Sequence, residues 1–433
     1  MDLLVYPAQR LAGVIDPPSS KNYTTRYLLA AALAEGESTI LYPAVSEDSA
    51  ALQSCLKALG AAISMTEGEV PTMRVKGFGR NPQQPGVLNP GNAGAVLRFL
   101  MAVAAATLPE TTFVTDYAES LGKRPQGDLL TALAQLGAGV QSREGKLPIT
   151  IRGGNLAGGT VRVSGSISSQ YTSALLFAAP LIGRDVTIEV EGELKSRPPI
   201  RQTLQVLREA GITVEAAADL TRFAIPGGQS YQTRTYTVPG DYPGAAALMA
   251  AAAVVPSDVT IRRMYRDEQG ERAAVDVLRA MGADITHEGD EVRIRGGRTL
   301  VGGRFDGDPF TDAVLALVAA ATVADGQTVF YNVENLRYKE CDRISDYRHE
   351  LLKLGARVGE GQAELIINGR PEGLDGGTAD SCTDHRVIMG LTIGALASHQ
   401  PVRIREAQHI GKSYPGFFDD LRRLGARVET TRE

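Results

Sequence analysis

The sequence is poor in cysteine, has no tryptophan and contains no long apolar run. Its three cysteines, Cys55, Cys341 and Cys382, form no CxxC pair, so neither a disulfide framework nor a zinc ribbon is indicated. The longest apolar run, residues 244–255, is shorter than the roughly 20 residues that a membrane helix needs. The N-terminus also lacks a basic segment followed by an apolar core, which excludes a signal peptide. We therefore expect a protein of the reducing cytoplasm.

An excess of positive charge is absent as well. The chain carries 45 Lys and Arg against 50 Asp and Glu, a net charge of −5, which argues against binding nucleic acid through bulk charge. Any anion must then be met by a local cluster of cations. The 433 residues exceed the size at which one hydrophobic core stops growing, about 250–300 residues, so more than one domain is expected.

What the sequence has instead is an internal repeat. The pattern Leu-x-x-apolar-Gly-small-x-Val/Ile occurs six times, at intervals of 77, 74, 71, 73 and 70 residues. Apolar residues at positions i and i+3 predict a helix, and the glycine is typical of the position just past a helix end. The glycines of the pattern are Gly60, Gly137, Gly211, Gly282, Gly355 and Gly425.

Two further elements recur with the same period. A half-buried strand closed by glycine follows in five copies, at Gly77, Gly153, Gly227, Gly296 and Gly369. An Ala-rich helix leading into a β-branched strand interleaves with it. Small side chains let helices approach closely, so we expect these helices inside and the sheets outside.

The repeats predict an α/β fold of six βαβαββ units with three units in each of two domains. We expect residues 1–19 plus 239–433 to form one domain, with a strand at residues 11–15, and residues 20–238 to form the other. No GxGxxG follows a strand and no GxxxxGK[ST] occurs, so neither a Rossmann fold nor a P-loop is indicated.

Basic and hydroxyl-bearing turns precede several Ala-rich helices, where a helix N-terminus favours anions. They include Lys21 with Arg26, the Gly91-Asn92-Ala93-Gly94 turn with Arg98, Arg124, and Ser166-Ile167-Ser168-Ser169-Gln170. The second half adds Asp312, Arg337-Tyr338-Lys339-Glu340-Cys341-Asp342-Arg343, Asp384-His385-Arg386 and Lys412. Arginine holds carboxylate or phosphate bidentately, and Asp312 and Glu340 are placed among these cations to move protons. This pattern indicates one strongly positive cleft.

These motifs, in this order over the whole chain, resemble the 5-enolpyruvylshikimate-3-phosphate synthase family of enolpyruvyl transferases. The resemblance implies a two-domain inside-out α/β barrel with the active site in the cleft between the domains. It implies transfer of the enolpyruvyl group of phosphoenolpyruvate to the 5-hydroxyl of shikimate 3-phosphate through a tetrahedral intermediate. It also implies no metal or organic cofactor and only small-molecule partners, and we expect a monomer that binds neither nucleic acid nor membranes.

The resemblance also assigns residues. It implies Asp312 as the base toward the 5-hydroxyl, Glu340 as the proton carrier at C3, and Lys21 and Lys412 as further catalytic residues. The implied phosphoenolpyruvate ligands are Lys21, Gly94, Arg124, Gln170, Arg343, Arg386 and Lys412. The implied shikimate 3-phosphate ligands are Lys21, Asn22, Arg26, Ser168, Ser169, Gln170, Ser196, Arg197, Asp312, Asn335 and Lys339.

Four residues depart from the family pattern. Asn22 stands where serine is usual, Ala95 and Phe99 replace the threonine and proline of the turn, and Pro199 replaces an aromatic residue. In the family, the helix with Ala95 and Phe99 borders the place where the herbicide glyphosate competes with phosphoenolpyruvate. Arg197 is a candidate to compensate for Pro199 by holding phosphate.

Three other functions compete with this interpretation. A UDP-N-acetylglucosamine enolpyruvyl transferase would carry a cysteine in the loop of residues 115–124, which has none. An RNA 3′-phosphate cyclase-like enzyme would carry a nucleotide-linked histidine signature, which is absent. A non-catalytic scaffold or a degenerate homologue that binds ligand only would not need Lys21, Asp312, Glu340 and Lys412 together.

Structural roles compete at single positions. Ser168 and Ser169 fit a helix cap. Glu340 and Arg343 fit an i, i+3 ion pair on a helix. Asp384 and His385 fit a purely structural role, and the role of His385 in the family pattern is not assigned.

Overall fold

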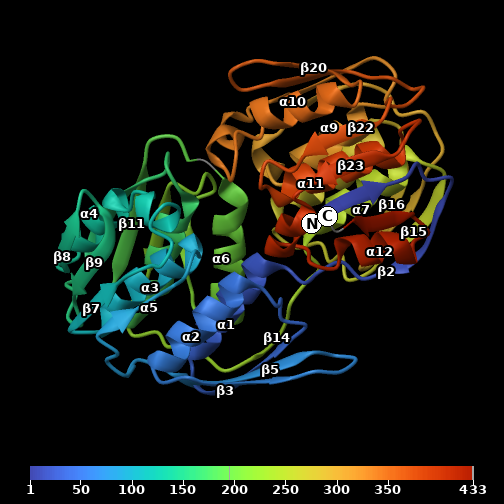
Figure 1. Ribbon diagram of the computed structural model, residues 1–433. Coiled ribbons are helices and arrows are strands. Elements are labelled where there is room, and N and C mark those ends of the chain that lie inside the picture. Colours follow the sequence, from blue (N-terminus) through green and yellow to red (C-terminus); the bar gives the residue numbers. More distant parts are fainter. Residues whose placement is uncertain (195, 432–433) are drawn as a thin grey trace. The chain divides into compact units, whose positions relative to one another are not determined.

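The computed structural model describes residues 1–194 and 196–431, which form two compact units (Figure 1). Unit 1 comprises Met1–Pro18 and Pro239–Glu433, and unit 2 comprises Ser19–Val238. The chain thus begins in unit 1, passes through the whole of unit 2 and returns. Each unit is described by itself below.

Unit 2 alternates helices and strands along the chain. Its helices, the short 3₁₀ helix η1 included, are α1 (Lys21–Leu33), α2 (Glu47–Ala58), α3 (Gly94–Thr107), η1 (Leu121–Lys123), α4 (Gly127–Gln135), α5 (Ser169–Ile182) and α6 (Arg197–Glu209). Its strands are β3 (Glu35–Leu41), β4 (Ala62–Thr66), β5 (Thr72–Phe78), β6 (Val87–Leu88), β7 (Glu110–Phe113), β8 (Gly139–Arg143), β9 (Lys146–Arg152), β10 (Gly159–Ser164), β11 (Val186–Glu191), β12 (Glu215–Ala216), β13 (Arg222–Ile225) and β14 (Thr235–Thr237).

Unit 1 repeats the same alternation. Its helices are α7 (Tyr242–Val254), η2 (Gly270–Arg272), α8 (Ala273–Ala280), η3 (Asp308–Phe310), α9 (Val314–Ala321), η4 (Glu334–Tyr338), α10 (Ser345–Lys353), α11 (His385–Leu396), η5 (Ala407–Lys412) and α12 (Phe417–Arg423). Its strands are β1 (Asp2–Val5), β2 (Leu11–Ile15), β15 (Ser257–Ile261), β16 (Asp284–Glu288), β17 (Glu291–Arg295), β18 (Arg304–Asp306), β19 (Gln327–Tyr331), β20 (Arg357–Glu360), β21 (Leu365–Asn368), β22 (Gly377–Asp380), β23 (Val402–Arg405) and β24 (Val428–Thr431).

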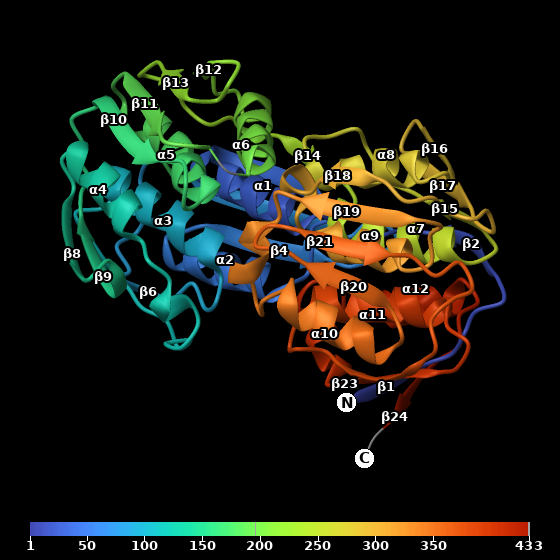
Figure 2. The ribbon, with the colours of Figure 1, turned by 90° about the horizontal axis from the view of Figure 1, so that it is seen from above.

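Every sheet of the described chain has the same four-stranded topology, and each unit holds three such sheets. The order β18-β19-β21-β20 is representative: β18 and β19 are parallel, and the other two neighbouring pairs are antiparallel. Figure 2 shows β19 and β21 side by side in this sheet. The parallel pair is joined by a buried helix, as a crossover connection requires. The predicted α/β class with six βαβαββ repeats is confirmed.

Three strands reach their sheets from a distant part of the chain. β2 pairs in parallel with β15, so the predicted strand at residues 11–15 is confirmed within unit 1. β14, at the end of unit 2, pairs in parallel with β3 near its start. β1 lies between β23 and β24 and supplies the strand that the sixth repeat lacks. Sequence reasoning missed β1, because four residues carry too short an alternation to be recognised.

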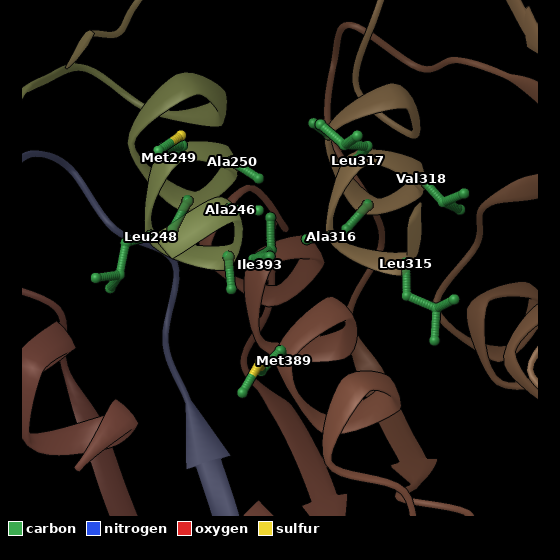
Figure 3. Close-up of a cluster of buried hydrophobic side chains, with 14 of the residues drawn as sticks. Ala246, Leu248, Met249, Ala250, Leu315, Ala316, Leu317, Val318, Met389 and Ile393 are labelled. Carbon is green, nitrogen blue, oxygen red and sulfur yellow. The ribbon is translucent and has the colours of Figure 1, made fainter. Parts of the chain in front are cut away.

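Ala-rich helices form the interior of each unit. In unit 1, α7, α9 and α11 pack against one another, and every residue of α9 is buried. Figure 3 shows Ala246 and Ala250 of α7, Ala316 of α9 and Ile393 of α11 in this cluster. The outer helices, such as α10 and α12, expose their polar faces. The predicted inner position of the Ala-rich helices is therefore confirmed.

The glycine that ends a repeat's strand marks a close approach to the buried helix. A Cβ on Gly153 would lie 2.0 Å from the carbonyl oxygen of Ala105 in α3, and one on Gly369 would lie 2.0 Å from that of Ala324. The matching contacts at Gly77 and Gly296 are 2.2 and 2.1 Å. No side chain fits at such distances, so the strand can pack on the helix end only if glycine stands there.

The other repeated glycine ends a helix. Gly60, just after α2, has a φ of 103°, and Gly425, just after α12, has a φ of 105°. This left-handed backbone favours glycine and lets the chain turn from the helix into the next strand. The six-fold glycine pattern in the sequence thus has a direct conformational cause.

We expect Gly153→Ala to lower the free energy of unfolding by about 1–3 kcal/mol, because the added methyl group must displace the end of α3. Thermal unfolding followed by circular dichroism measures the change. Gly127→Ala is the matched control, since a Cβ there meets no atom within 4 Å. Equal unfolding temperatures for the two variants would contradict the close-approach explanation.

Candidate active site

The residues that the sequence singled out lie at the N-terminal ends of the buried helices. Lys21 begins α1, Gly94 begins α3, and Ser168 is the N-cap of α5. In unit 1, Asp312 precedes α9 and Asp384 is the N-cap of α11. A helix N-terminus carries partial positive charge and free N–H donors, so each of these ends favours an anion.

In unit 1, the site is built around one buried guanidinium group, that of Arg343. Its Nε donates to Asp384 Oδ2 at 2.7 Å, its Nη1 to Asp312 Oδ1 at 3.0 Å and its Nη2 to Glu340 Oε2 at 2.8 Å. Lys412, at the end of η5, forms an ion pair with Glu340. We call Arg343, Asp312, Glu340, Asp384 and Lys412 the Arg343 cluster.

Two carboxylates of the Arg343 cluster, those of Glu340 and Asp312, stay ionised because cations surround them. Burial alone would raise the pKa of Glu340, but Arg343 and Lys412 hold it well below its ordinary value. Burial would also raise the pKa of Asp312, but the positive charges of Lys339, Arg386 and Arg343 outweigh this effect and lower its pKa well below the ordinary value. Burial would lower the pKa of Arg343, but its carboxylate partners raise this pKa above the ordinary value. Glu340, Asp312 and Arg343 are therefore charged together at neutral pH.

Three more predicted residues adjoin the cluster. Lys339 Nζ lies 4.0 Å and Arg386 Nη2 3.9 Å from Asp312 carboxylate oxygens. His385 is buried beside Asp384, and burial with the charges of Arg386 and Arg343 lowers its pKa well below the usual value. Its ring is therefore neutral at physiological pH.

Several buried polar atoms here lack a partner among the described residues. They are Arg386 Nε, His385 Nδ1, Asn335 Oδ1 and Ser413 Oγ. Buried polar groups are nearly always hydrogen-bonded, so unsatisfied groups of this kind near one charged cluster indicate a ligand site.

The motif around Glu340 divides into two roles. Arg337 Nη1 bonds Asp342 Oδ2 at 2.8 Å, and Arg337 Nη2 bonds the carbonyl oxygen of Gly361 at 2.7 Å. These two residues fix the loop, while Lys339, Glu340 and Arg343 face the cluster. The alternative that Glu340 and Arg343 are a pair on a helix is wrong, because α10 begins only at Ser345.

In unit 2, Arg98 of α3 forms hydrogen bonds with predicted residues at the start of α5. Its Nη1 donates to Gln170 Oε1 at 2.6 Å and to Ser168 Oγ at 3.5 Å, and its Nε donates to Gln126 at 2.9 Å. A Cβ on Gly94 would lie 3.3 Å from Arg124 Nη1 and 3.6 Å from Arg98 Nη1. Gly94, Arg124, Ser168 and Gln170 therefore belong to one group.

Ser168 serves two purposes. Its Oγ accepts the backbone N–H of Gln170 at 3.3 Å, which caps α5, and it also faces Arg98. The structural interpretation of the serine pair is thus correct for Ser168 without excluding a ligand. Ser169 follows as the first residue of α5 and is buried.

The start of α1 forms a second group in unit 2. Lys21 Nζ pairs with Asp48 Oδ2 at 3.0 Å, and Asn22 follows it in the first turn. Arg26 is buried, donates to Thr203 and to the carbonyl oxygens of Asn22 and Pro199, and lies over the ring of Phe99.

Two of the departures from the family pattern, Phe99 and Pro199, therefore both contact Arg26. Burial lowers the pKa of Arg26 to about 10, so the side chain stays charged at neutral pH. Its hydrogen bonds go to Thr203, Asn22 and Pro199, all within unit 2.

The predicted ligands of α6 stand at the start of that helix. Ser196 is its N-cap with a φ of 55°, an unusual backbone for serine, and Arg197 is its first residue. Non-glycine residues with such backbone angles concentrate at functional sites.

Sequence reasoning missed three contributors. Asp384 and Arg98 stood in recognised motifs but received no role, although Asp384 holds Arg343 and Arg98 holds Gln170. Glu271 in η2 stood in no motif. Burial and the nearby charges of Asp312 and Asp241 raise its pKa to about 8. Its spacing in the sequence gives no sign of this, since packing of η2 against η3 creates the environment.

Within residues 1–194 and 196–431, no three His, Cys, Asp or Glu side chains are grouped so as to hold a metal ion. Over the same residues, none of the helices has the length and apolar character to span a membrane.

Comparison with known proteins gives a consistent result. Residues 5–421 match the family model of EPSP synthase (3-phosphoshikimate 1-carboxyvinyltransferase). The chain is 52% identical to the 3-phosphoshikimate 1-carboxyvinyltransferase of Deinococcus radiodurans, over 99% of this chain and 97% of that protein. It is 40% identical to that of Burkholderia pseudomallei, over 97% and 93%. Among solved structures, EPSP synthase from Acinetobacter baumannii aligns with a TM-score of 0.87 at 25% identity, over 99% and 100% of the two chains.

The charged network predicts a pH dependence of stability. The folded pKa of Glu340 lies below its ordinary value of 4.5, so its charge stabilises the fold above that pH and the stabilisation is lost as the pH falls further. We expect Glu340→Gln to lower the urea midpoint at pH 7, and this deficit to shrink between pH 4.5 and pH 3. Glu67→Gln, an exposed position between β4 and β5, should show no such trend. A deficit independent of pH would contradict the ionised network.

Proposed function

The chain belongs to the EPSP synthase (3-phosphoshikimate 1-carboxyvinyltransferase) family, and from this premise we propose that it transfers the enolpyruvyl group of phosphoenolpyruvate to the 5-hydroxyl of shikimate 3-phosphate. The products are 5-enolpyruvylshikimate 3-phosphate and phosphate. This is a step of the shikimate pathway to the aromatic amino acids. The observation that carries the proposal is the Arg343 cluster, in which two ionised carboxylates beside a buried neutral histidine lie among cations that fit anionic substrates.

We assign the phosphoenolpyruvate ligands to two groups. Arg343, Arg386 and Lys412 lie together in unit 1, and Gly94, Arg124 and Gln170 lie together in unit 2. Guanidinium groups bind carboxylate and phosphate through paired hydrogen bonds. We also assign Lys21 to phosphoenolpyruvate. Binding of the substrates between the domains stays a prediction.

We assign shikimate 3-phosphate to the serine-bearing turns of unit 2 and to residues of the Arg343 cluster and its neighbours in unit 1. Ser168 and Ser169 offer hydroxyls at the start of α5. At the start of α6, Ser196 offers a hydroxyl and Arg197 a guanidinium group. The remaining proposed ligands are Lys21, Asn22, Arg26, Gln170, Asp312, Asn335 and Lys339. The unpartnered Asn335 Oδ1 suits a sugar-like hydroxyl.

The reaction needs one proton delivered to C3 and two removed, one from the 5-hydroxyl and one from C3. C3 of phosphoenolpyruvate takes a proton, and the 5-hydroxyl oxygen attacks the cationic C2 as its own proton leaves. The adduct then loses phosphate together with a proton from C3, which regenerates the double bond. Asp312 accepts the hydroxyl proton, a role that its ionised state in the ligand-free chain permits.

Glu340 carries the proton at C3, although its pKa is low in the ligand-free chain. The charges that lower it are those of Arg343 and Lys412, which are also proposed phosphoenolpyruvate ligands. When anionic groups of the substrate take these cations, the pKa of Glu340 rises toward the range where it can hold a proton. Lys412, already paired with Glu340, is placed to supply that proton.

An assay of phosphate release from phosphoenolpyruvate and shikimate 3-phosphate tests the function. We expect release with this pair and none with UDP-N-acetylglucosamine as acceptor. Release only with the sugar nucleotide would overturn the proposed acceptor.

In the same assay, Glu340→Gln should lower kcat on the order of 10²–10⁴-fold, with little change in either KM, because the proton carrier acts in the transition state. Glu334→Gln, a half-exposed glutamate in the same loop, is the matched control. Unchanged turnover in Glu340→Gln would remove this residue from proton transfer.

A second variant tests the unit 2 group. The methyl group of Gly94→Ala crowds the Arg124 guanidinium at 3.3 Å, so we expect the KM for phosphoenolpyruvate to rise by about tenfold, or ~1.4 kcal/mol. Ala95→Ser, one residue further along α3, should change it far less. A KM that rises only for shikimate 3-phosphate would place Gly94 at the other substrate.

A further inference from the structure

Unit 1 contains an open, cation-rich cavity whose residues have no role in the proposed reaction. Its volume is about 240 Å³, and it is lined by Arg266, Arg272, Val275, Asp276, Arg279 and His287. These residues come from η2, from α8, from β16 and from the segment before η2. None of them belongs to the Arg343 cluster or to the groups around Arg98 and Arg26.

The arginines of this cavity use few of their N–H donors within the protein. Arg266 Nη2 donates to the carbonyl oxygen of His287 at 3.0 Å, and Arg279 forms an ion pair with Asp276 at 2.7 Å. The Arg272 side chain makes no hydrogen bond or ion pair with any described residue. The guanidinium groups of Arg266 and Arg272, both exposed and both lining the cavity, therefore keep most of their N–H donors available for a ligand.

The opposing negative charges are few and already engaged. Asp276 is neutralised by Arg279. Asp267, whose charge acts on Arg272, is buried and accepts a hydrogen bond from Gln269. The lining itself holds three arginines against one aspartate, so it carries an excess of positive charge.

His287 reports this excess from inside the cavity. Its Nε2 lies 2.6 Å from the carbonyl oxygen of Met264, which fixes the ring. Burial lowers its pKa, and the charges of Arg266, Arg272 and Arg279 lower it further. All three arginines thus lie near enough to act on one ring.

We propose that Arg266, Arg272, Arg279 and His287 form a second anion site, which binds the phosphate group of a small phosphorylated molecule. Planar guanidinium forks match phosphate oxygens bidentately. A cavity of about 240 Å³ holds a phosphate group with a few further atoms, because one water occupies ~30 Å³. The site goes beyond the proposed function, whose substrates bind elsewhere.

Histidine NMR on the full chain tests the site without measuring turnover, so failure of the proposed function would not affect it. The His287 Cε1–H resonance, assigned through its loss in His287→Gln, is followed during titration with sodium phosphate against sodium chloride of equal ionic strength. We expect a saturable shift with phosphate and with glycerol 3-phosphate, and none with malonate or chloride.

Variants decide whether the arginines are responsible. Arg272→Gln should weaken phosphate binding at least tenfold, whereas Arg298→Gln, an exposed arginine paired with Asp284, should leave it unchanged. No saturable shift, an equal response to malonate, or an unchanged titration in Arg272→Gln would each overturn the proposal. The separate His385 resonance shows binding at the Arg343 cluster in the same spectra.

Discussion

Close packing of short side chains is the constraint on which the rest of this structure depends. Alanine along α7, α9 and α11 lets these helices touch within unit 1, and glycine at the strand ends lets the sheets close over their C-termini. The opposite ends of the helices are then left for loops. The residues of the candidate active site lie at or next to those loops, where the helix N-termini favour anions, while the packed interior holds each loop in place.

The Arg343 cluster shows what such a framework permits. A buried guanidinium with carboxylates on several sides costs desolvation free energy, which only good geometry and full hydrogen bonding offset. Here Asp384 does both, since it caps α11 through the N–H of Arg386 and also receives Arg343 Nε. A residue that fixes a helix start thereby fixes the orientation of the cation beside Asp312 and Glu340. The start of α11 and the candidate active site thus share the same hydrogen bonds at this point.

How much could be predicted from the sequence depended on the range of the interactions. Gly60 was recognisable because the same backbone turn after a helix requires glycine in all six repeats. Gly153 was recognisable because the same close contact at a strand end requires glycine in five of them. β1 was not recognisable, since its place between β23 and β24 is a contact across about 400 residues.

The site divides in the same way. The motifs located Lys339, Glu340 and Arg343. The hydrogen bonds from Arg343 to Asp384 and the environment of Glu271, in contrast, arise from packing of segments far apart in the chain. Spacing could reveal which residue types gather, but not which of them hold the others.

The exchange of strands between distant segments imposes an order in time on synthesis. Unit 2 is complete once β14 has left the ribosome, so it can fold while unit 1 is still being made. β1 and β2, translated first, must stay unpaired until β15, β23 and β24 arrive. Open strand edges invite pairing with other chains, so the shortness of β1 and β2 limits aggregation of the nascent protein.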